Sequence, residues 1–552
     1  MASPDEYVFQ PHERPMLPGS PATPTHPPRR RAAYLGIGVL LGMTGGLNTA
    51  LLTAALPQIQ GALALTPSEG GWLTAIYSMT SVCMSALMIR FRQHFGLQRF
   101  MRVYLLAYVA LTIVQLFVHD FTAELIVRGV GGLVGSALTT LALFYIMQAL
   151  PPAKRLGAMI LGFGLAQLAL PLARLLAPLL LYEGEIENLF RLEAGLTLIC
   201  LAAVALLRLP PSERINAIEP LDFVSILLLA PGVALLCAVL VQGRITWWDT
   251  PWLGWALAAA IPLIGAALLI EHNRARPMLN TRWMRSRNMI RFVVIATVVR
   301  VLLSEQSYGS VGLLTAVGMT SDQLITLNLV IFLASLAGLL AGVLTVRPTD
   351  LLLPLIASAV LIAIGAFMDS HASNLTRPAN LYVSQALIAF AALYSMAPMI
   401  MAGVLRALSK GFSHIISFSA LFAISQTVGG LAGVALLGSF QIVRARHHAA
   451  ELAQGLSPVD PLVTGRLQAL GGAYGRVLGD PALRQAEGGV LLAQQVTREA
   501  NILAYNDVFL LIAVLAALTA LWLGARWVRL RLSGINPFAE DLAALQRMRQ
   551  RQ

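Results

Sequence analysis

Long apolar stretches alternate with short polar connections over most of the chain. Many of these stretches reach the length of about 20 residues that a helix needs to cross a bilayer, so the pattern predicts membrane-spanning helices. Fourteen spans are predicted, near residues 33–56, 72–89, 103–118, 122–146, 156–181, 189–207, 221–242, 251–270, 289–312, 322–346, 349–368, 381–405, 413–440 and 503–525. The expected fold class is therefore an all-α membrane protein with about 14 transmembrane helices.

Three segments fall outside this alternation. Residues 1–32 begin with a Pro-rich polar stretch and are predicted to be a disordered cytoplasmic N-terminus, and residues 528–552 a cytoplasmic tail. Residues 441–500 are polar and join the last two spans as a long periplasmic loop, in which Ala- and Leu-rich stretches could form short helices. The loop contains His447 and His448, but no third ligand has a suitable spacing, so a solvated loop is favoured over a metal site.

Basic residues gather on one side of the predicted spans. If the N-terminus is cytoplasmic, seventeen Arg and Lys residues fall in the inner loops, and only Arg244 and Arg377 in the short outer loops. This asymmetry is what the positive-inside rule predicts. The sequence therefore predicts a multi-pass protein of the cell inner (plasma) membrane with both termini cytoplasmic.

Composition supports the membrane assignment and limits the classes of function. Of 552 residues, 57% are hydrophobic and 12% charged, about half the charged fraction of soluble domains. The net charge of +12 could indicate nucleic-acid binding, but the basic residues lie between apolar stretches, where topology requires them, so no nucleic-acid partner is expected. Cys83, Cys200 and Cys237 lie inside apolar stretches and match no metal or disulfide spacing, so no metal or cofactor is predicted.

Charged residues inside the spans are the candidates for function, because each costs roughly 2.5 to 3.5 kcal/mol to insert. Together with the polar Asn48, they form a predicted substrate and proton pathway of Asn48, Arg128, Arg174, Glu193, Arg300 and Glu305. All except Arg300 are expected at a similar depth near the outer side. In the alternative interpretation, residues near helix ends, such as Arg174 and Glu193, merely extend to the membrane interface.

Several short motifs recur in a characteristic order. They are LNTALLTAALPQIQGAL at 47–63, Arg128 with the Gly-rich run that follows it, LPPAKRLGAM at 150–159, VGGLAGVALLG at 428–438 and AYNDVF at 504–509. In this order and spacing the chain resembles the major facilitator superfamily, specifically the fourteen-helix drug:proton antiporters of the EmrB/QacA type. It departs from that family at Asn48, where the family has Asp, and at Arg174 and Leu175, where the family has a Gly-Pro pair.

The resemblance implies two six-helix bundles, at residues 33–209 and 289–527, with two extra helices between them at 221–270. Such proteins bind substrate near the midplane and work by alternating access. The resemblance also implies a small-molecule substrate and a proton as ligands, and it allows a periplasmic adaptor and an outer-membrane channel as partners.

The leading hypothesis is a secondary active transporter that exports small amphipathic compounds, in drug or organic-acid efflux, by proton antiport. The alternative is an uptake or facilitative transporter of the same fold without proton antiport. A membrane enzyme or receptor is disfavoured because HExxH, GxSxG and GxxxxGK[ST] motifs are missing from the sequence.

Two further predictions concern the charges themselves. Because Asn48 cannot titrate, Glu305 or Glu193 is predicted to carry the proton. Three Arg against two Glu in the spans favour an anionic or zwitterionic substrate, since an unpaired buried charge is costly. In the alternative, Arg174 pairs with Glu193 and does not meet the substrate.

Overall fold

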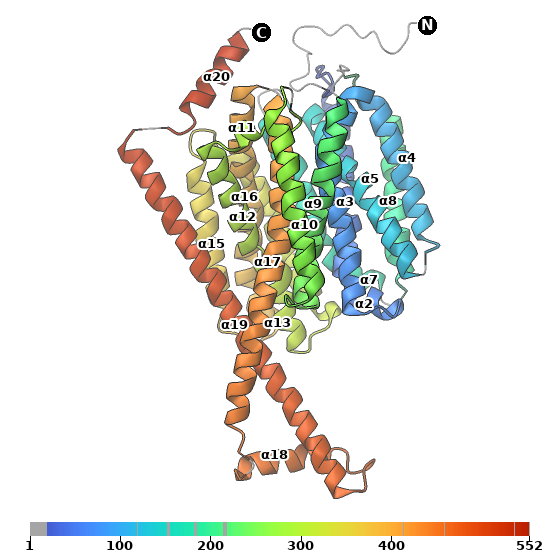
Figure 1. Cartoon of the computed structure of the whole chain (residues 1–552), viewed down its shortest axis with the longest axis vertical. Coiled ribbons are helices and arrows are strands. Elements are labelled where there is room, and N and C mark those ends of the chain that lie inside the picture. Colours follow the sequence, from blue (N-terminus) through green and yellow to red (C-terminus); the bar gives the residue numbers. More distant parts are fainter. Residues whose placement is uncertain are drawn as a thin grey trace.

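Figure 1 shows the helices of the computed structural model lying side by side, with a helical hairpin projecting from one end. The start of helix α1 and the end of helix α19 lie at the opposite end. We call these the hairpin end and the terminal end. The structure describes residues 19–118, 120–151, 155–181, 185–212, 218–275, 277–411, 413–457, 459–534 and 536–550.

The N-terminal bundle has six spans, one of which is divided. Local sequence explains the helix starts: Thr66 and Glu69 form a capping box before α3, and the Asp120 carboxylate accepts a hydrogen bond from the Ala123 N–H to cap α5. The fifth span is interrupted at Leu168, between α6 and α7. The helices are α1 (Pro28–Ala54), the short α2 (Leu56–Ala62), α3 (Pro67–Phe95), α4 (Leu97–Gln115), α5 (Phe121–Ala149), α6 (Arg155–Gln167), α7 (Ala169–Leu180) and α8 (Glu187–Leu206).

Helices α9 (Pro220–Ile245) and α10 (Pro251–Asn273) form the predicted pair between the two bundles. Helix α9 packs on α3 and α17, and α10 packs mainly on α9. On α10, Trp255 is 76% exposed and Ile261 65% exposed. An apolar helix whose large side chains remain uncovered is suited to contact lipid.

The C-terminal bundle also has six spans, and its first is irregular. After α12 the helix widens into a π-helical turn, Glu305–Gly309, before α13 continues it. Such turns are uncommon and occur frequently at functional sites. The helices are α11 (Thr281–Met284), α12 (Arg287–Leu302), α13 (Ser310–Ala316), α14 (Ile325–Thr345), α15 (Leu352–Asp369), α16 (Tyr382–Lys410), α17 (Ser413–Gln454), α18 (Pro461–Gly472), α19 (Pro481–Leu532) and α20 (Ala539–Gln550), with 3-10 turns at Ser321–Leu324 and Pro378–Leu381.

The predicted all-α membrane fold is confirmed. Within the described residues, twelve helices are individually long and apolar enough to cross a membrane. Helix α3, bent by 50° after Met84, makes a thirteenth. The remaining predicted span corresponds to α12 and α13, which the π-helical turn divides, so about fourteen spans agree with the fold.

Residues 441–500 differ from the predicted loop. Helix α17 continues to Gln454 and α19 already begins at Pro481, so most of the segment extends two membrane-spanning helices, with α18 joining them (Figure 1). The exposed polar side chains of these extensions led to the prediction of a loop. The structure shows a helical hairpin instead.

The start of the described chain also differs from the sequence prediction. Ala22 is fully buried, and its backbone N–H donates to the carbonyl of Pro211. The Gln148 amide donates to the carbonyl of Ala22, and α1 already begins at Pro28. The prediction of disorder over 1–32 therefore does not hold for residues 19–32, because these contacts order the backbone; residues 1–18 lie outside the described part.

Candidate transport pathway

Two adjoining pockets lie between the N- and C-terminal bundles. Gln167, Met396 and Gln426 line both of them. The wider pocket extends toward the terminal end between α3, α6 and α17, and Phe163 and Phe422 face each other in it. The described lining of the two pockets contains Arg92, Arg174 and Arg300 but neither Asp nor Glu. The cavity is therefore apolar in most of its lining and positively charged.

Three of the predicted pathway residues meet in one buried cluster of the N-terminal bundle. The Asn48 amide on α1 donates to Glu193 on α8, and Tyr108 on α4 donates to the same carboxylate oxygen over 3.3 Å. Arg128 on α5 donates through Nη1 to the backbone and side-chain oxygens of Asn48, each at 3.2 Å. Glu193 is 2% exposed, so it does not extend to the interface as the alternative reading of the sequence proposed.

Glu124 completes this N-terminal cluster and was missed from the sequence. Its carboxylate lies 2.8 Å from Nε of Arg128, four residues later on α5, and it accepts a hydrogen bond from Gln115. Both members of this ion pair are about 2% exposed or less. The i,i+4 spacing of opposite charges was the signal that could have revealed Glu124.

Arg174 lies in the cavity and connects the two bundles. It projects from α7 of the N-terminal bundle and donates to the carbonyls of Gln306 and Ser307 over 3.0 Å each. Both carbonyls belong to the π-helical turn of the C-terminal bundle. Arg174 therefore does not pair with Glu193, and its guanidinium bonds only neutral carbonyls among the described groups.

Arg300, on α12 of the C-terminal bundle, also lines the cavity. Its Nε donates to the carbonyl of Gln426 on α17 over 3.2 Å, and its side chain rests against Gly429 and Gly430. A side chain at either glycine would crowd the Arg300 side chain. These glycines therefore let α17 approach α12 while the guanidinium remains at the cavity.

Glu305 belongs to a second buried cluster, in the C-terminal bundle. The Gln385 amide nitrogen on α16 lies 2.9 Å from Glu305 Oε1 and 2.7 Å from Asp369 Oδ2, and donates to both. Glu305 and Gln385 are fully buried, and Asp369 is 2% exposed. Asp369 was missed because the predicted span ended at residue 368, whereas α15 ends at Asp369 itself.

The six predicted pathway residues therefore occupy three places. Asn48, Arg128 and Glu193 share the N-terminal cluster, and Glu305 lies in the C-terminal one. Arg174 and Arg300 line the cavity between them. The similar depth that was predicted for five of them does not correspond to one cavity, because Asn48, Arg128 and Glu193 bond within the N-terminal bundle and Glu305 within the C-terminal one.

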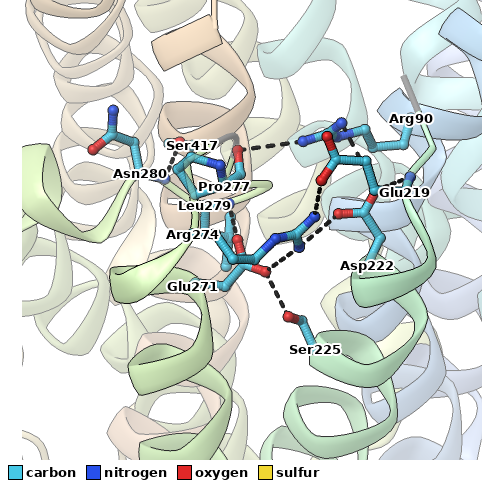
Figure 2. Close-up of polar contacts among 10 residues, drawn as sticks. All are labelled: Arg90, Glu219, Asp222, Ser225, Glu271, Arg274, Pro277, Leu279, Asn280 and Ser417. Carbon is cyan, nitrogen blue, oxygen red and sulfur yellow. Dashed lines mark hydrogen bonds and ion pairs between the residues drawn. The ribbon is translucent and has the colours of Figure 1, made fainter. Parts of the chain in front are cut away.

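A further ionic network at the terminal end was not predicted (Figure 2). Arg274, just after α10, binds Glu219, Asp222 and Glu271 at 2.8 Å each, and Arg90 of α3 lies 3.7 Å from Asp222. Burial disfavours the charged guanidinium, but the three carboxylates outweigh this effect and raise the pKa of Arg274. The network thus fastens the two central helices to the N-terminal bundle.

The comparisons with known proteins agree with this architecture. Residues 38–434 match the model of the Major Facilitator Superfamily. A search of curated protein sequences found no match. Among solved structures, the chain is similar to the human organic anion transporter MFSD10 (TM-score 0.53, 14% identity), covering 89% of this chain and 100% of that one.

Two further solved structures show the same fold. The proton:xylose symporter XylE has a TM-score of 0.51 and 13% identity, with 88% of this chain and 95% of that one covered. A POT family transporter in complex with 5-aminolevulinic acid has a TM-score of 0.51 and 12% identity, with 89% and 96% covered.

The chain belongs to the Major Facilitator Superfamily. Together with the apolar helices and the cavity between two bundles, this makes it a multi-pass membrane transporter and not an enzyme.

Proposed function

We propose that the protein exports small amphipathic organic anions by proton-coupled alternating access. The observation that carries this proposal is the cavity lining, in which Arg92, Arg174 and Arg300 occur without an acidic residue in the described part. An anionic group offsets this charge, and the apolar remainder of the lining suits a hydrophobic body. Aromatic and medium-chain carboxylic acids combine both features.

The direction of transport rests on topology. With the basic loops inside, as the positive-inside rule favours, the terminal end is cytoplasmic and the hairpin end periplasmic. The wider pocket then lies on the cytoplasmic side, and Arg174 joins the two bundles nearer the outside. This arrangement fits a transporter that loads its substrate from the cytoplasm. We therefore place the protein among the antiporters of the EmrB/QacA type, in the inner membrane. The projecting hairpin is then the part that a periplasmic adaptor could contact.

Proton coupling requires a carboxyl group that can change its protonation inside the bundle. Glu193 and Glu305 are both buried, and neither belongs to the described lining of the two pockets. Coupling therefore passes through protein conformation and not through direct contact between proton and substrate. The alternative, transport without proton antiport, is favoured by Asn48, which replaces the family's Asp and cannot titrate.

Substrate charge is tested by transport into inside-out vesicles. Uptake of salicylate and decanoate should fall at least tenfold in Arg300→Gln and Arg92→Gln, because a neutral amide cannot offset the carboxylate. Arg99→Gln, at an exposed position outside the cavity, is the matched control. If the vesicles instead transport ethidium, and the cavity variants leave carboxylate uptake unchanged, the anion proposal is wrong.

The same vesicles separate antiport from facilitated transport. An imposed pH gradient, acidic inside, should drive the carboxylate above its equilibrium concentration, and a protonophore should abolish that accumulation. Equilibration without accumulation would instead support the facilitative alternative.

A further inference from the structure

Two carboxylates in the C-terminal bundle share one hydrogen-bond donor. Nε2 of Gln385 donates to Glu305 Oε1 at 2.9 Å and to Asp369 Oδ2 at 2.7 Å. One nitrogen therefore holds the two acidic groups within roughly 6 Å of each other, the range in which like charges oppose each other's ionisation. The three side chains come from the π-helical turn, α16 and α15.

The polar atoms of this cluster are not all satisfied. Glu305 Oε2 and the amide oxygen of Gln385 are buried and have no hydrogen-bond partner in the described structure. Both residues are fully buried. When Glu305 is ionised, both atoms can only accept hydrogen bonds, so the cluster lacks donors for them.

The surroundings do not supply a cation at contact distance. Arg174 on α7 is the nearest described guanidinium to the turn, but it donates to the carbonyls of Gln306 and Ser307. On α9, Arg244 lies over the ring of Tyr308, and on α19 the titratable neighbour is Tyr505, 6.0 Å from that ring. On α17, Gln441 accepts a hydrogen bond from the Tyr308 hydroxyl. Within the described residues, neither Glu305 nor Asp369 forms an ion pair.

The free-energy cost of burying Glu305 and Asp369 together indicates that this cluster binds a proton. Two ionised carboxylates buried together without a cation would cost several kcal/mol. One proton removes one of the negative charges and turns an acceptor oxygen into an O–H donor. It therefore corrects both the charge and the shortage of donors, at the position where the helix widens into a π-helical turn.

We propose that Glu305, Asp369 and Gln385 form a single binding site for one proton shared by the two carboxylates. The proton enters from water, forms an O–H bond on one carboxylate oxygen, and leaves to water when the bundles rearrange. Gln385 is a positioning residue that holds the carboxylates together. The use of this site in transport rests on the proposed function, but its protonation does not.

The site is adjacent to the element that links the bundles. Arg174, which lines the cavity, donates to the carbonyls of the two residues that directly follow Glu305, so a substrate anion that binds the guanidinium in their place releases those carbonyls. Release of the turn changes the surroundings of Glu305. Substrate binding and proton release are thereby connected through one π-helical turn, without the two ligands touching.

Infrared spectroscopy of the full-length protein in lipid nanodiscs tests the site without any substrate. The C=O band of a protonated carboxylic acid should persist in the wild type at neutral pH. In the double variant Glu305→Gln, Asp369→Asn, the intensity of this band should fall by the contribution of one acid group. Each single variant should lose its acid band at a lower pH than the wild type, because the neighbouring negative charge is gone. Glu271→Gln, which replaces a buried carboxylate that is ion-paired with Arg274, is the matched control and should retain the band.

Three results would overturn the site. The double variant could keep the full acid band, or Glu271→Gln could remove it. Alternatively, Na⁺ could abolish the band at constant pH where choline does not, which would identify a sodium site. Transport provides a second readout: Glu305→Gln and Asp369→Asn should lose accumulation driven by the pH gradient but retain substrate exchange at equilibrium. A correct infrared result with no carboxylate transport would refute the proposed function and leave the proton site standing.

Discussion

The two bundles bury carboxylates in opposite ways. In the N-terminal bundle, Glu124 and Glu193 are bonded to a network that contains the buried Arg128. In the C-terminal bundle, Glu305 and Asp369 share the neutral amide of Gln385, and neither forms an ion pair with another described residue. The first arrangement holds charges in place, whereas the second can change its charge by one proton. The difference indicates that the N-terminal cluster serves chiefly as structure and the C-terminal cluster as a switch.

Removing the cation of the N-terminal cluster should have the largest effect on stability. Arg128→Met leaves two buried carboxylates without their guanidinium, which should cost about 3 to 5 kcal/mol. The measurement is thermal unfolding of the purified protein in detergent. Adding Glu124→Gln to this variant should recover part of the loss. A melting temperature like that of the wild type would show that the ion pair does not hold the bundle.

A second substitution makes the N-terminal cluster resemble the C-terminal one. Asn48→Asp replaces the amide donor of Glu193 by a second carboxyl group, which can donate only while it is protonated. Stability should therefore be close to that of the wild type at low pH and fall by about 1 to 3 kcal/mol as the pH rises and the new group ionises. Melting temperatures across pH, compared with Asn48→Ser, test this. A loss that is independent of pH would contradict it.

Loss of the Arg174 contacts between the bundles should shift the equilibrium between transporter conformations more than it lowers the free energy of unfolding. Arg174→Ala removes two hydrogen bonds to the π-helical turn, worth about 1 to 1.5 kcal/mol together, or roughly a tenfold shift between conformations. A Leu170→Cys reporter in the cavity, with the three native cysteines replaced by Ala, should then react faster with a maleimide added from the hairpin side. Arg99→Ala is the control. Unchanged labelling would mean that Arg174 does not close that side.

The smallest effect on stability is expected in the C-terminal cluster. Glu305→Gln substitutes a neutral amide for a group that we propose shares a proton, so the free energy of unfolding should change by less than about 1 kcal/mol. The free energy of unfolding of Glu305→Gln is compared with that of Arg128→Met, and both variants are measured in the same detergent. A loss as large as that of Arg128→Met would show that Glu305 is also a structural charge.

The sequence predicted the spans well, because apolar length and Arg position are local properties. It predicted the clusters less well, because the partners of a buried charge lie on other helices. Asp369 lies at the end of α15, where a boundary error of one residue decides whether a carboxylate counts as buried. Glu124 lay inside the predicted span 122–146, but its pairing with Arg128 was not recognised. Arg174 and Glu193 were expected at the same depth and lie in different surroundings, since depth does not specify the direction in which a side chain points. The extension of α17 and α19 beyond the membrane was also hidden, because an exposed polar helix has no apolar run.

The hairpin turns small rotations into large displacements. Helices α17 and α19 contain 42 and 52 residues and run without interruption from the C-terminal bundle into the hairpin. About 20 residues of helix beyond the bundle extend roughly 30 Å, so tilting their base by about 10° moves the far end by about 5 Å. A fluorophore pair with one dye on α18 and one at the hairpin end of the N-terminal bundle would therefore report each turnover as a change in the distance between the two dyes.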